Sequence, residues 1–357
     1  MSFDELNFTS SPNFRFQEVV SDKKDCLSTT YQFDCFQDKS GKTILIAPYF
    51  DIDDVLGQDH HISLINLKNN KVEKELKGHK DRVTIVRYFQ NPETKNDYFI
   101  SADRSYSVIV WDLSNDCNII FEKELKYEGF INCALLMFIK NNMYAVVSSI
   151  GANNSTKIID VNDKNFVREI ESSKNIIMFF LEHWVNKNQE DEDKKNVIIQ
   201  CGKNKIILTE FPSNNTYYVD DTDEKNPFIL GGIVFKNNDR DLFAFSSSYG
   251  LIKIIDLENK TSVKSIQLEK VQLYSFVRWN ERYLLINDCL QRRIIVIDVL
   301  DDYKIKSKVL CPEMNFDRFI KKIEHPIYGE SILSIGIDWR IKLFVTRDIM
   351  KPKTKNS

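Results

Sequence analysis

The chain has few of the residues that usually make tight turns, with 11 glycines and 8 prolines among 357 residues. This scarcity excludes a collagen-like chain and a disordered chain rich in Gly and Pro. We expect Asn pairs such as Asn69-Asn70, Asn141-Asn142 and Asn237-Asn238 to form turns instead, because Asn tolerates the left-handed backbone conformation. An excess of one charge is also lacking, since 49 basic residues oppose 52 acidic ones. We therefore expect no nucleic-acid binding driven by a basic surface.

Long hydrophobic runs and paired cysteines are lacking as well. The densest apolar stretch, Ile176–Leu181, has six residues, whereas a membrane-spanning helix needs about 20. The first residues, MSFDELNF, show no apolar segment typical of a signal peptide. Seven cysteines are scattered without a C-x-x-C pair, which favours reduced thiols in a core over disulfides or a zinc site. We expect an intracellular protein, cytoplasmic or nuclear, with no membrane segment.

A short pattern recurs along the chain: a few apolar β-formers, then an acidic or amide residue, then an apolar residue. Its clearest example is VIVWDL at Val108–Leu113. The fifth positions of successive copies lie 42 to 50 residues apart, and such even spacing indicates an internal repeat. The seven copies are Ile62–Leu67, Val108–Leu113, Thr156–Val161, Ile206–Phe211, Ile252–Leu257, Ile294–Val299 and Ile341–Thr346.

Three further β-rich segments lie between consecutive copies. After the second copy they are Ile119–Leu125, Phe130–Ile139 and Met143–Ile150, bounded by polar residues. Four strands in a repeat of roughly 46 residues are typical of a β-propeller blade. The apolar segments Phe130–Ile139 and Ile176–Val185 are expected to be inner strands, buried between blades. A helix over Ile176–Val185 would break the four-strand count of its blade.

The seventh copy is followed only by the short basic segment 347–357, which leaves no room for a fourth strand. The alternating segment Phe14–Val20 is expected to supply that strand and so to close the ring. Closure removes exposed sheet edges that could pair with other chains. We therefore predict an all-β fold, a single seven-bladed β-propeller over residues 14–346, with tails at 1–13 and 347–357.

The second repeat carries the residues of a known motif. Gly78-His79 precedes Trp111-Asp112 by 32 residues, with strands expected at Val83–Tyr88, Tyr98–Asp103 and Val108–Leu113. This repeat resembles the WD-repeat β-propeller family. The other repeats diverge, because the position of Trp111 is held by Ile65, Ile159, Thr209, Ile255, Ile297 and Phe344.

The resemblance implies a structural hydrogen-bonded network in each complete blade, made by a His, a Ser or Thr, an Asp and the Trp. Ser105 holds the usual Asp position of the second blade, with Asp103 two residues earlier. The matching residues are His79, Ser101, Asp103 and Trp111 in the second blade, Asp59 in the first and Asp338 in the seventh. We expect structural roles for all six.

Motifs that carry catalysis are lacking. The chain has no G-x-S-x-G, no P-loop, no G-x-G-x-x-G and no H-E-x-x-H. Asp59, His60 and His61 could suggest a metal site, but consecutive strand residues point to opposite faces and cannot easily share one ion. We expect no enzyme activity, no cofactor and no metal. A carboxylate pair in a propeller channel stays open, because sequence spacing cannot reveal it.

WD-repeat proteins commonly bind partners on the face that carries the loops between blades and the turns between second and third strands. Aromatic and Arg residues are enriched in interface hot spots, and this face offers Arg104, Tyr106, Tyr249, Gln291, Arg292, Trp339 and Arg340. The leading hypothesis is a monomeric, non-enzymatic scaffold that holds other proteins or peptides in a complex. One alternative is a reader of peptides or modified histones, with an aromatic cage at the central opening drawn from Tyr106, Tyr249 and Trp339. A hydrolase or lyase is the other.

Overall fold

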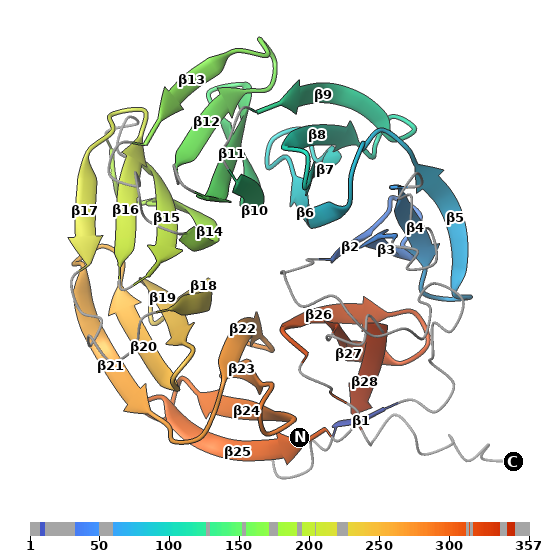
Figure 1. Ribbon diagram of the computed structural model, residues 1–357. Helices are drawn as coiled ribbons and strands as arrows, with labels where there is room; N and C mark the ends of the chain where they lie inside the picture. Colours follow the sequence, from blue (N-terminus) through green and yellow to red (C-terminus); the bar gives the residue numbers. More distant parts are fainter. Residues whose placement is uncertain are drawn as a thin grey trace, which may run out of the picture.

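The computed structural model describes residues 8–10, 33–49, 60–125, 129–151, 155–170, 178–190, 195–203, 205–219, 228–311, 314, 317–335 and 341–346. These residues form 28 strands, which make seven four-stranded antiparallel sheets. Figure 1 shows the sheets arranged as blades around a central opening, with consecutive blades side by side. The predicted all-β, seven-bladed propeller is confirmed.

The strands of each blade run outward from the central opening in chain order. Blade one has β2 (Asp34–Gln37), β3 (Thr43–Pro48), β4 (Ile62–Asn66) and β5 (Lys71–Leu76). Blade two has β6 (Val83–Gln90), β7 (Asp97–Asp103), β8 (Ser107–Asp112) and β9 (Asn118–Glu124). Blade three has β10 (Gly129–Ile139), β11 (Asn142–Gly151), β12 (Thr156–Asp160) and β13 (Phe166–Glu169). Blade four has β14 (Met178–Val185), β15 (Asn196–Gly202), β16 (Ile206–Phe211) and β17 (Thr216–Val219).

The remaining blades follow the same order. Blade five has β18 (Ile229–Asn237), β19 (Arg240–Ser247), β20 (Leu251–Asp256) and β21 (Thr261–Gln267). Blade six has β22 (Leu273–Arg278), β23 (Tyr283–Asp288), β24 (Arg293–Asp298) and β25 (Lys304–Leu310). Blade seven has β26 (Phe319–His325), β27 (Gly329–Ile335) and β28 (Ile341–Thr346), followed outward by β1 (Phe8–Ser10).

The seven copies of the repeated pattern are the third strands of the seven blades. Their residues are apolar on both faces because neighbouring blades cover both faces, and β20 is buried along its whole length. Outer strands differ: β25 alternates exposed and half-buried residues, with Lys304, Lys306 and Lys308 exposed. The inner strand β14 confirms the strand interpretation of Ile176–Val185 over the helical one.

An N-terminal strand closes the ring, as predicted. The strand that does so is β1, which pairs antiparallel with β28 and places Phe8 opposite Thr346. It lies within the segment expected to be a tail, whereas Phe14–Val20, expected in this role, lies outside the described residues. Alternation marks a segment able to form a strand, but it does not fix which segment pairs with a given edge when that edge needs only three residues.

The hydrophobic core is divided among the blade interfaces. Seven clusters of buried residues are present, one between each pair of neighbouring blades. Between blades two and three, for example, Phe121 and Ile100 pack with Ile131. The described cysteines are free thiols, and five of the six are buried, as predicted for core thiols.

Left-handed Asn residues in turns and bulges in the inner strands are two further features of the backbone. Asn70, Asn141 and Asn238 occupy the left-handed region with φ of 58°, 67° and 48°, so Asn makes turns where Gly is scarce. Several inner strands carry a bulge near their first residues, as between Ile229 and Gly231 in β18. Such bulges redirect side chains, here toward the central opening. In the part of the chain that the structure describes, no helix is long and apolar enough to cross a membrane.

Candidate functional site

The second blade contains the network that its motif implies. His79 Nδ1 lies 2.9 Å from Asp103 Oδ2, and His79 Nε2 lies 2.7 Å from Ser101 Oγ. Trp111 Nε1 donates to the same Ser101 Oγ at 2.8 Å. Ser105 does not replace Asp103 but donates to its other oxygen, Oδ1, at 2.9 Å. The strand ends therefore bring these side chains together and tie the first, second and third strands of the blade to one another.

A Ser, a His and an Asp in contact resemble the arrangement of a hydrolase, but this set is closed to substrate. The side chains of His79 and Asp103 are 0% exposed, and Ser101 is also 0% exposed. Burial alone would raise the pKa of Asp103, but hydrogen bonds from His79, Ser107 N and Ser105 outweigh burial and hold the pKa below its ordinary value. The charged carboxylate is thus a fixed acceptor within the blade.

Other predicted residues are not all described. Asp59, Asp338, Trp339 and Arg340 lie outside the described residues. Of the two histidines considered as metal ligands, His61 is buried and stacks on Tyr49 with ring centroids 4.1 Å apart. Among the described residues, no group of three or more His, Cys, Asp or Glu side chains is placed to hold a metal ion.

The predicted partner-binding residues fall into two groups. Arg104 and Tyr106 lie in the turn after β7 of blade two and are half-buried, and Tyr106 packs against the core between blades two and three. Tyr249 lies in the corresponding turn of blade five and is 57% exposed. Gln291 and Arg292 lie in that turn of blade six and are exposed. The first group is Arg104 and Tyr106 on blade two. The second group is Tyr249, Gln291 and Arg292, which lie on the neighbouring blades five and six.

Blades five and six carry a group of exposed residues in and beside linked turns, which we call the rim patch. Gln267 Nε2 donates to Tyr249 O at 2.9 Å, and Gln291 Nε2 donates to Lys270 O at 3.2 Å, so the turns of the two blades are linked. Two leucines that sequence analysis missed belong to this surface, Leu290 at 46% and Leu310 at 68% exposure. The rim patch consists of Tyr249, Lys270, Leu290, Arg292 and Leu310.

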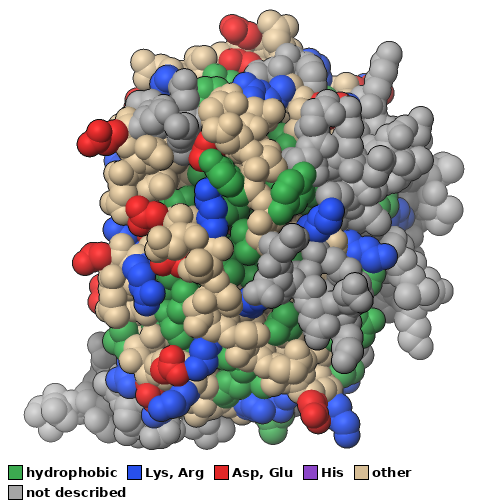
Figure 2. Space-filling view, turned by 90° about the vertical axis from the view of Figure 1, so that its left-hand side faces the viewer, with side chains coloured by type: hydrophobic (Ala, Val, Ile, Leu, Met, Phe, Trp, Pro, Cys, Tyr) green, Lys and Arg blue, Asp and Glu red, His purple; other side chains and the backbone are tan. Residues whose placement is uncertain are grey.

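The rim patch is both apolar and basic. Lys270 and Arg292 are exposed and form no ion pair with another residue that the structure describes. The neighbouring Arg293, by contrast, is bound to buried Asp288 at 2.9 Å. Away from this face, the wall of the molecule seen in Figure 2 mixes charges of both signs with apolar side chains. Exposed apolar area beside unpaired cations is typical of an interaction surface.

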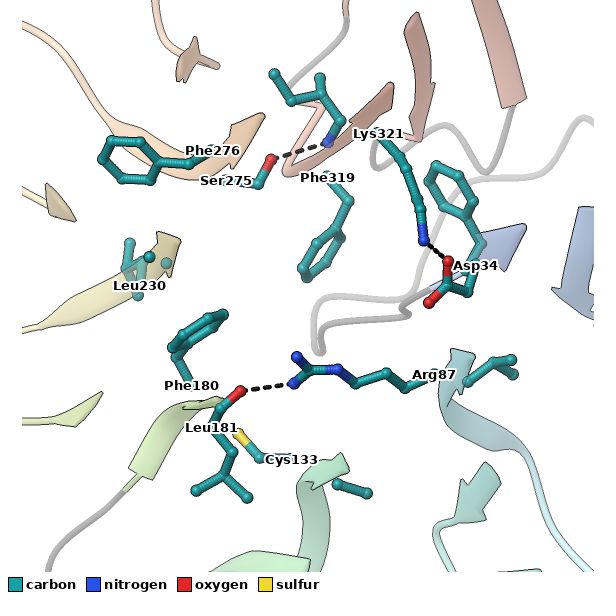
Figure 3. Close-up of a pocket in the computed structure, with 16 residues that line it drawn as sticks. Asp34, Arg87, Cys133, Phe180, Leu181, Leu230, Ser275, Phe276, Phe319 and Lys321 are labelled. Carbon is teal, nitrogen blue, oxygen red and sulfur yellow. Dashed lines mark hydrogen bonds and ion pairs between the residues drawn. The ribbon is translucent and has the colours of Figure 1, made fainter. Parts of the chain in front are cut away.

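The central opening contains a cavity of about 150 Å³. Every blade contributes to its lining from the innermost strand or the residue just before it: Phe33 and Asp34, Val86 and Arg87, Cys133 and Ala134, Phe180 and Leu181, Leu230 to Gly232, Ser275 and Phe276, and Phe319 to Lys321. Figure 3 shows Phe180, Leu230 and Phe319 around one space, whereas the Phe276 ring points away from it and packs in the core between blades five and six. Because the residues come from seven strands far apart in sequence, no local motif could reveal this site.

The cavity lies at the same end of the propeller as the rim patch. Its lining residues pair with the last few residues of the second strands, as Lys321 does with Leu333 and Gly231 with Ser246. The second strands of blades five and six, β19 and β23, end at the turns that carry the rim patch residues Tyr249 and Leu290. A partner on this face can therefore reach both places.

The charges in the cavity form two pairs. Arg87 of blade two reaches past blade three and donates from Nη2 to both carboxylate oxygens of Glu182 at 2.8 Å, while Nη1 donates to Leu181 O at 2.6 Å. Lys321 pairs with Asp34, as Figure 3 shows. Burial lowers the pKa of Lys321 to about 8, and the Asp34 carboxylate acts against that decrease. The two cations and the two carboxylates balance.

Neither the Cys133 thiol nor the Ser275 hydroxyl in the cavity lining is activated as a nucleophile by its described surroundings. Burial raises the pKa of the Cys133 thiol to about 12, so the thiol stays protonated near neutral pH. Ser275 Oγ accepts from Ile320 N at 2.8 Å and bonds Asn287 Oδ1 at 3.2 Å, with no His or Lys base in these contacts. Tyr106 and Tyr249 do not line the cavity either, so the aromatic cage considered from sequence is not formed by them.

No protein-family model matches the chain, and no curated protein sequence matches it.

Proposed function

We propose that this seven-bladed propeller is a divergent, non-enzymatic member of the WD-repeat family. It would act as a monomeric scaffold that holds protein partners through the rim patch. The observation that carries the proposal is the exposure of Tyr249, Leu290 and Leu310 in the linked turns of blades five and six, beside Lys270 and Arg292, two cations that form no ion pair with another described residue. Tyr and Arg side chains are enriched in interface hot spots, and the exposed leucines add apolar area beside them.

The charges on the rim patch favour a partner segment that is acidic as well as apolar. Arg292 and Lys270 form no ion pair with another described residue, so both can pair with carboxylates at the edge of a contact, while the two leucines supply apolar area. Ion pairs of this kind mainly increase the association rate and its dependence on salt. The WD-repeat assignment is supported by the blade count, the repeat length and the His79–Ser101–Trp111 network of blade two.

Affinity purification from the native organism with mass spectrometry tests the proposal. The rim variant Leu290→Ser/Arg292→Glu is compared with Leu300→Ser, because Leu300 is exposed on the same blade but in the turn after β24, at the opposite end. We expect defined partners with the wild type and Leu300→Ser, and a loss of at least tenfold with the rim variant. Equal recovery of every partner by both variants, or no specific partner at all, would overturn the proposal.

A further inference from the structure

The central cavity has properties of a binding site that are separate from those of the rim patch. Its volume of about 150 Å³ matches one medium-sized apolar group, since a dry apolar cavity of similar volume can accommodate a benzene ring. A whole folded element is too large for it. The size alone therefore selects one side chain or one small ring as the occupant.

The apolar part of the lining is incompletely covered by the protein. Phe180, Leu230 and Phe319 are only half-buried although they lie in the centre of the molecule. Leu230 is the bulged residue of β18, and it belongs to none of the seven core clusters of the described residues. Its side chain therefore faces the cavity and not a blade interface. Such apolar surface gains free energy when an apolar group covers it.

The charged part of the lining selects against an ion. Arg87 is neutralised by Glu182, and Lys321 is neutralised by Asp34. A ligand with a net charge would bring a charge without a partner into a partly desolvated space, which is unfavourable. Trimethyllysine would meet this difficulty, because both carboxylates already have a cation.

One hydrogen-bond donor in the cavity has unused capacity. The Lys321 ammonium has three N–H groups, and its contact in the described structure is Asp34. The Asp34 oxygens are held independently by Cys35 N at 2.7 Å and by Tyr88 N at 2.9 Å. The Lys321 side chain keeps 35% of its surface exposed, so a neutral acceptor such as an amide carbonyl can bind it without breaking the pair.

We propose that the central cavity binds one uncharged apolar residue of a peptide, with the ring or branched side chain among Phe180, Leu230 and Phe319 and a backbone carbonyl on Lys321. The site goes beyond the proposed scaffold function and does not depend on it. A failed cavity experiment leaves binding at the rim patch intact, and the reverse also holds.

The test uses ligand-observed NMR with the full chain and N-acetylphenylalanine amide as the probe. We expect weak saturable binding, on the order of millimolar for a probe of this size. N-acetylphenylalanine, which is an anion, phenylalanine amide, which is a cation, and Nα-acetyl-trimethyllysine amide should each bind at least fivefold more weakly. Equal or tighter binding of any charged probe would refute the selection for a neutral group.

Variants locate the binding. Leu230→Trp fills the cavity and should weaken the probe at least tenfold, whereas the exposed control Leu300→Ser should leave it unchanged. If Leu230→Trp fails to fold, Leu230→Ala serves instead: it enlarges the cavity and should shift the preference from the phenyl probe toward N-acetyl-2-naphthylalanine amide. Probe binding that neither change at Leu230 alters would place the probe elsewhere and overturn the proposal.

Two further experiments test the contact between Lys321 and the carbonyl and ask whether the bound residue can be part of a peptide. Lys321→Met should weaken N-acetylphenylalanine amide several-fold and leave toluene, which has no acceptor, unchanged. The pentapeptide acetyl-Gly-Gly-Phe-Gly-Gly-amide should bind at least as tightly as the single residue. If the pentapeptide does not bind, the cavity takes a free small molecule, which contradicts the proposal. If Lys321→Met weakens toluene binding as much as it weakens N-acetylphenylalanine amide binding, Lys321 only shapes the cavity and does not bind the carbonyl.

Discussion

Replacing Ser101 by Ala removes the oxygen at the centre of the network in blade two. That oxygen accepts from Trp111 Nε1 at 2.8 Å and lies 2.7 Å from His79 Nε2, and all three side chains are buried. Both nitrogens lose this partner and stay out of reach of water. Each buried polar group left unpaired costs about 1–3 kcal/mol. The variant should therefore lower the free energy of unfolding by about 2–5 kcal/mol.

Urea denaturation at pH 7, followed by far-UV circular dichroism, measures this loss as a shift in the midpoint at constant slope. Ser265→Ala is the matched control, because Ser265 is exposed on the outer strand β21. A surface change of this kind should stay within about 0.5 kcal/mol. A loss for Ser101→Ala no larger than that of the control would refute the claim that the network stabilises the blade.

A double-mutant cycle separates the contributions. Trp111→Phe keeps a ring against Phe99, whose centroid lies 5.6 Å from that of Trp111, but it removes the N–H that Ser101 accepts. In that background Ser101→Ala no longer leaves an indole nitrogen unpaired, so its cost should fall by about 1–3 kcal/mol. Strictly additive losses would show that Trp111 contributes by packing alone.

Three further predictions address the rim, the cavity and the outer strands. Gly250→Ala should lower the free energy of unfolding by at least ~1 kcal/mol in urea denaturation, because φ is +87° and an added Cβ would lie 2.4 Å from a neighbouring carbonyl oxygen. Competitive labelling with acetic anhydride should show Lys321 titrating near its pKa of about 8, and Asp34→Asn should lower that pKa further. Since unfolded lysine titrates near 10.4, the unfolded chain binds more protons between the two values, so this group makes stability rise with pH there. Lys306→Thr/Lys308→Thr should increase aggregation in light scattering without lowering stability, because exposed lysines protect the edge strand β25.

The fold could be predicted because each blade repeats one local pattern. Val108–Leu113 and Ile252–Leu257 lie in third strands covered on both faces, so they are mostly apolar, with an Asp at the fifth position, and they stand out at regular intervals. The closing strand could not be identified in the same way. Phe8–Ser10 is short and carries no pattern of its own, while the more strand-like Phe14–Val20 lies outside the described residues.

The candidate site was only partly predictable for a related reason. Tyr249 and Arg292 could be found because turns between known strands must be exposed and lie at one end of the propeller. Leu310 was missed because it is exposed only as the last residue of an outer strand, and the sequence does not distinguish it from a leucine that a strand buries. The cavity pair of Asp34 and Lys321 joins residues from opposite ends of the chain, which only ring closure brings together.

Two of the six divergent blades, blades four and seven, keep the position of Ser101 polar but give it different partners. In blades one, three, five and six an apolar residue takes the position: Ala47, Val147, Phe245 and Ile286. In blade four the corresponding residue is Gln200, which lies opposite Ile207, two residues before Thr209. Gln200 accepts from Thr209 Oγ1 at 3.2 Å and donates to Thr156 Oγ1 of blade three at 2.9 Å.

In blade seven the same position is Ser334, which donates to Asp317, and the other oxygen of Asp317 binds Lys342 Nζ at 2.8 Å. All of these groups except Lys342 are fully or almost fully buried. In blades four and seven, the absence of the tryptophan has therefore not left the blade without a buried polar network. A buried polar network has to be complete to be tolerated. Blade seven has a complete network of its own and blade four extends its network to blade three, whereas the other four blades without the Trp have an apolar residue at the Ser101 position. The Gln200–Thr156 bond couples two blades directly, whereas the His79 network couples strands within one blade.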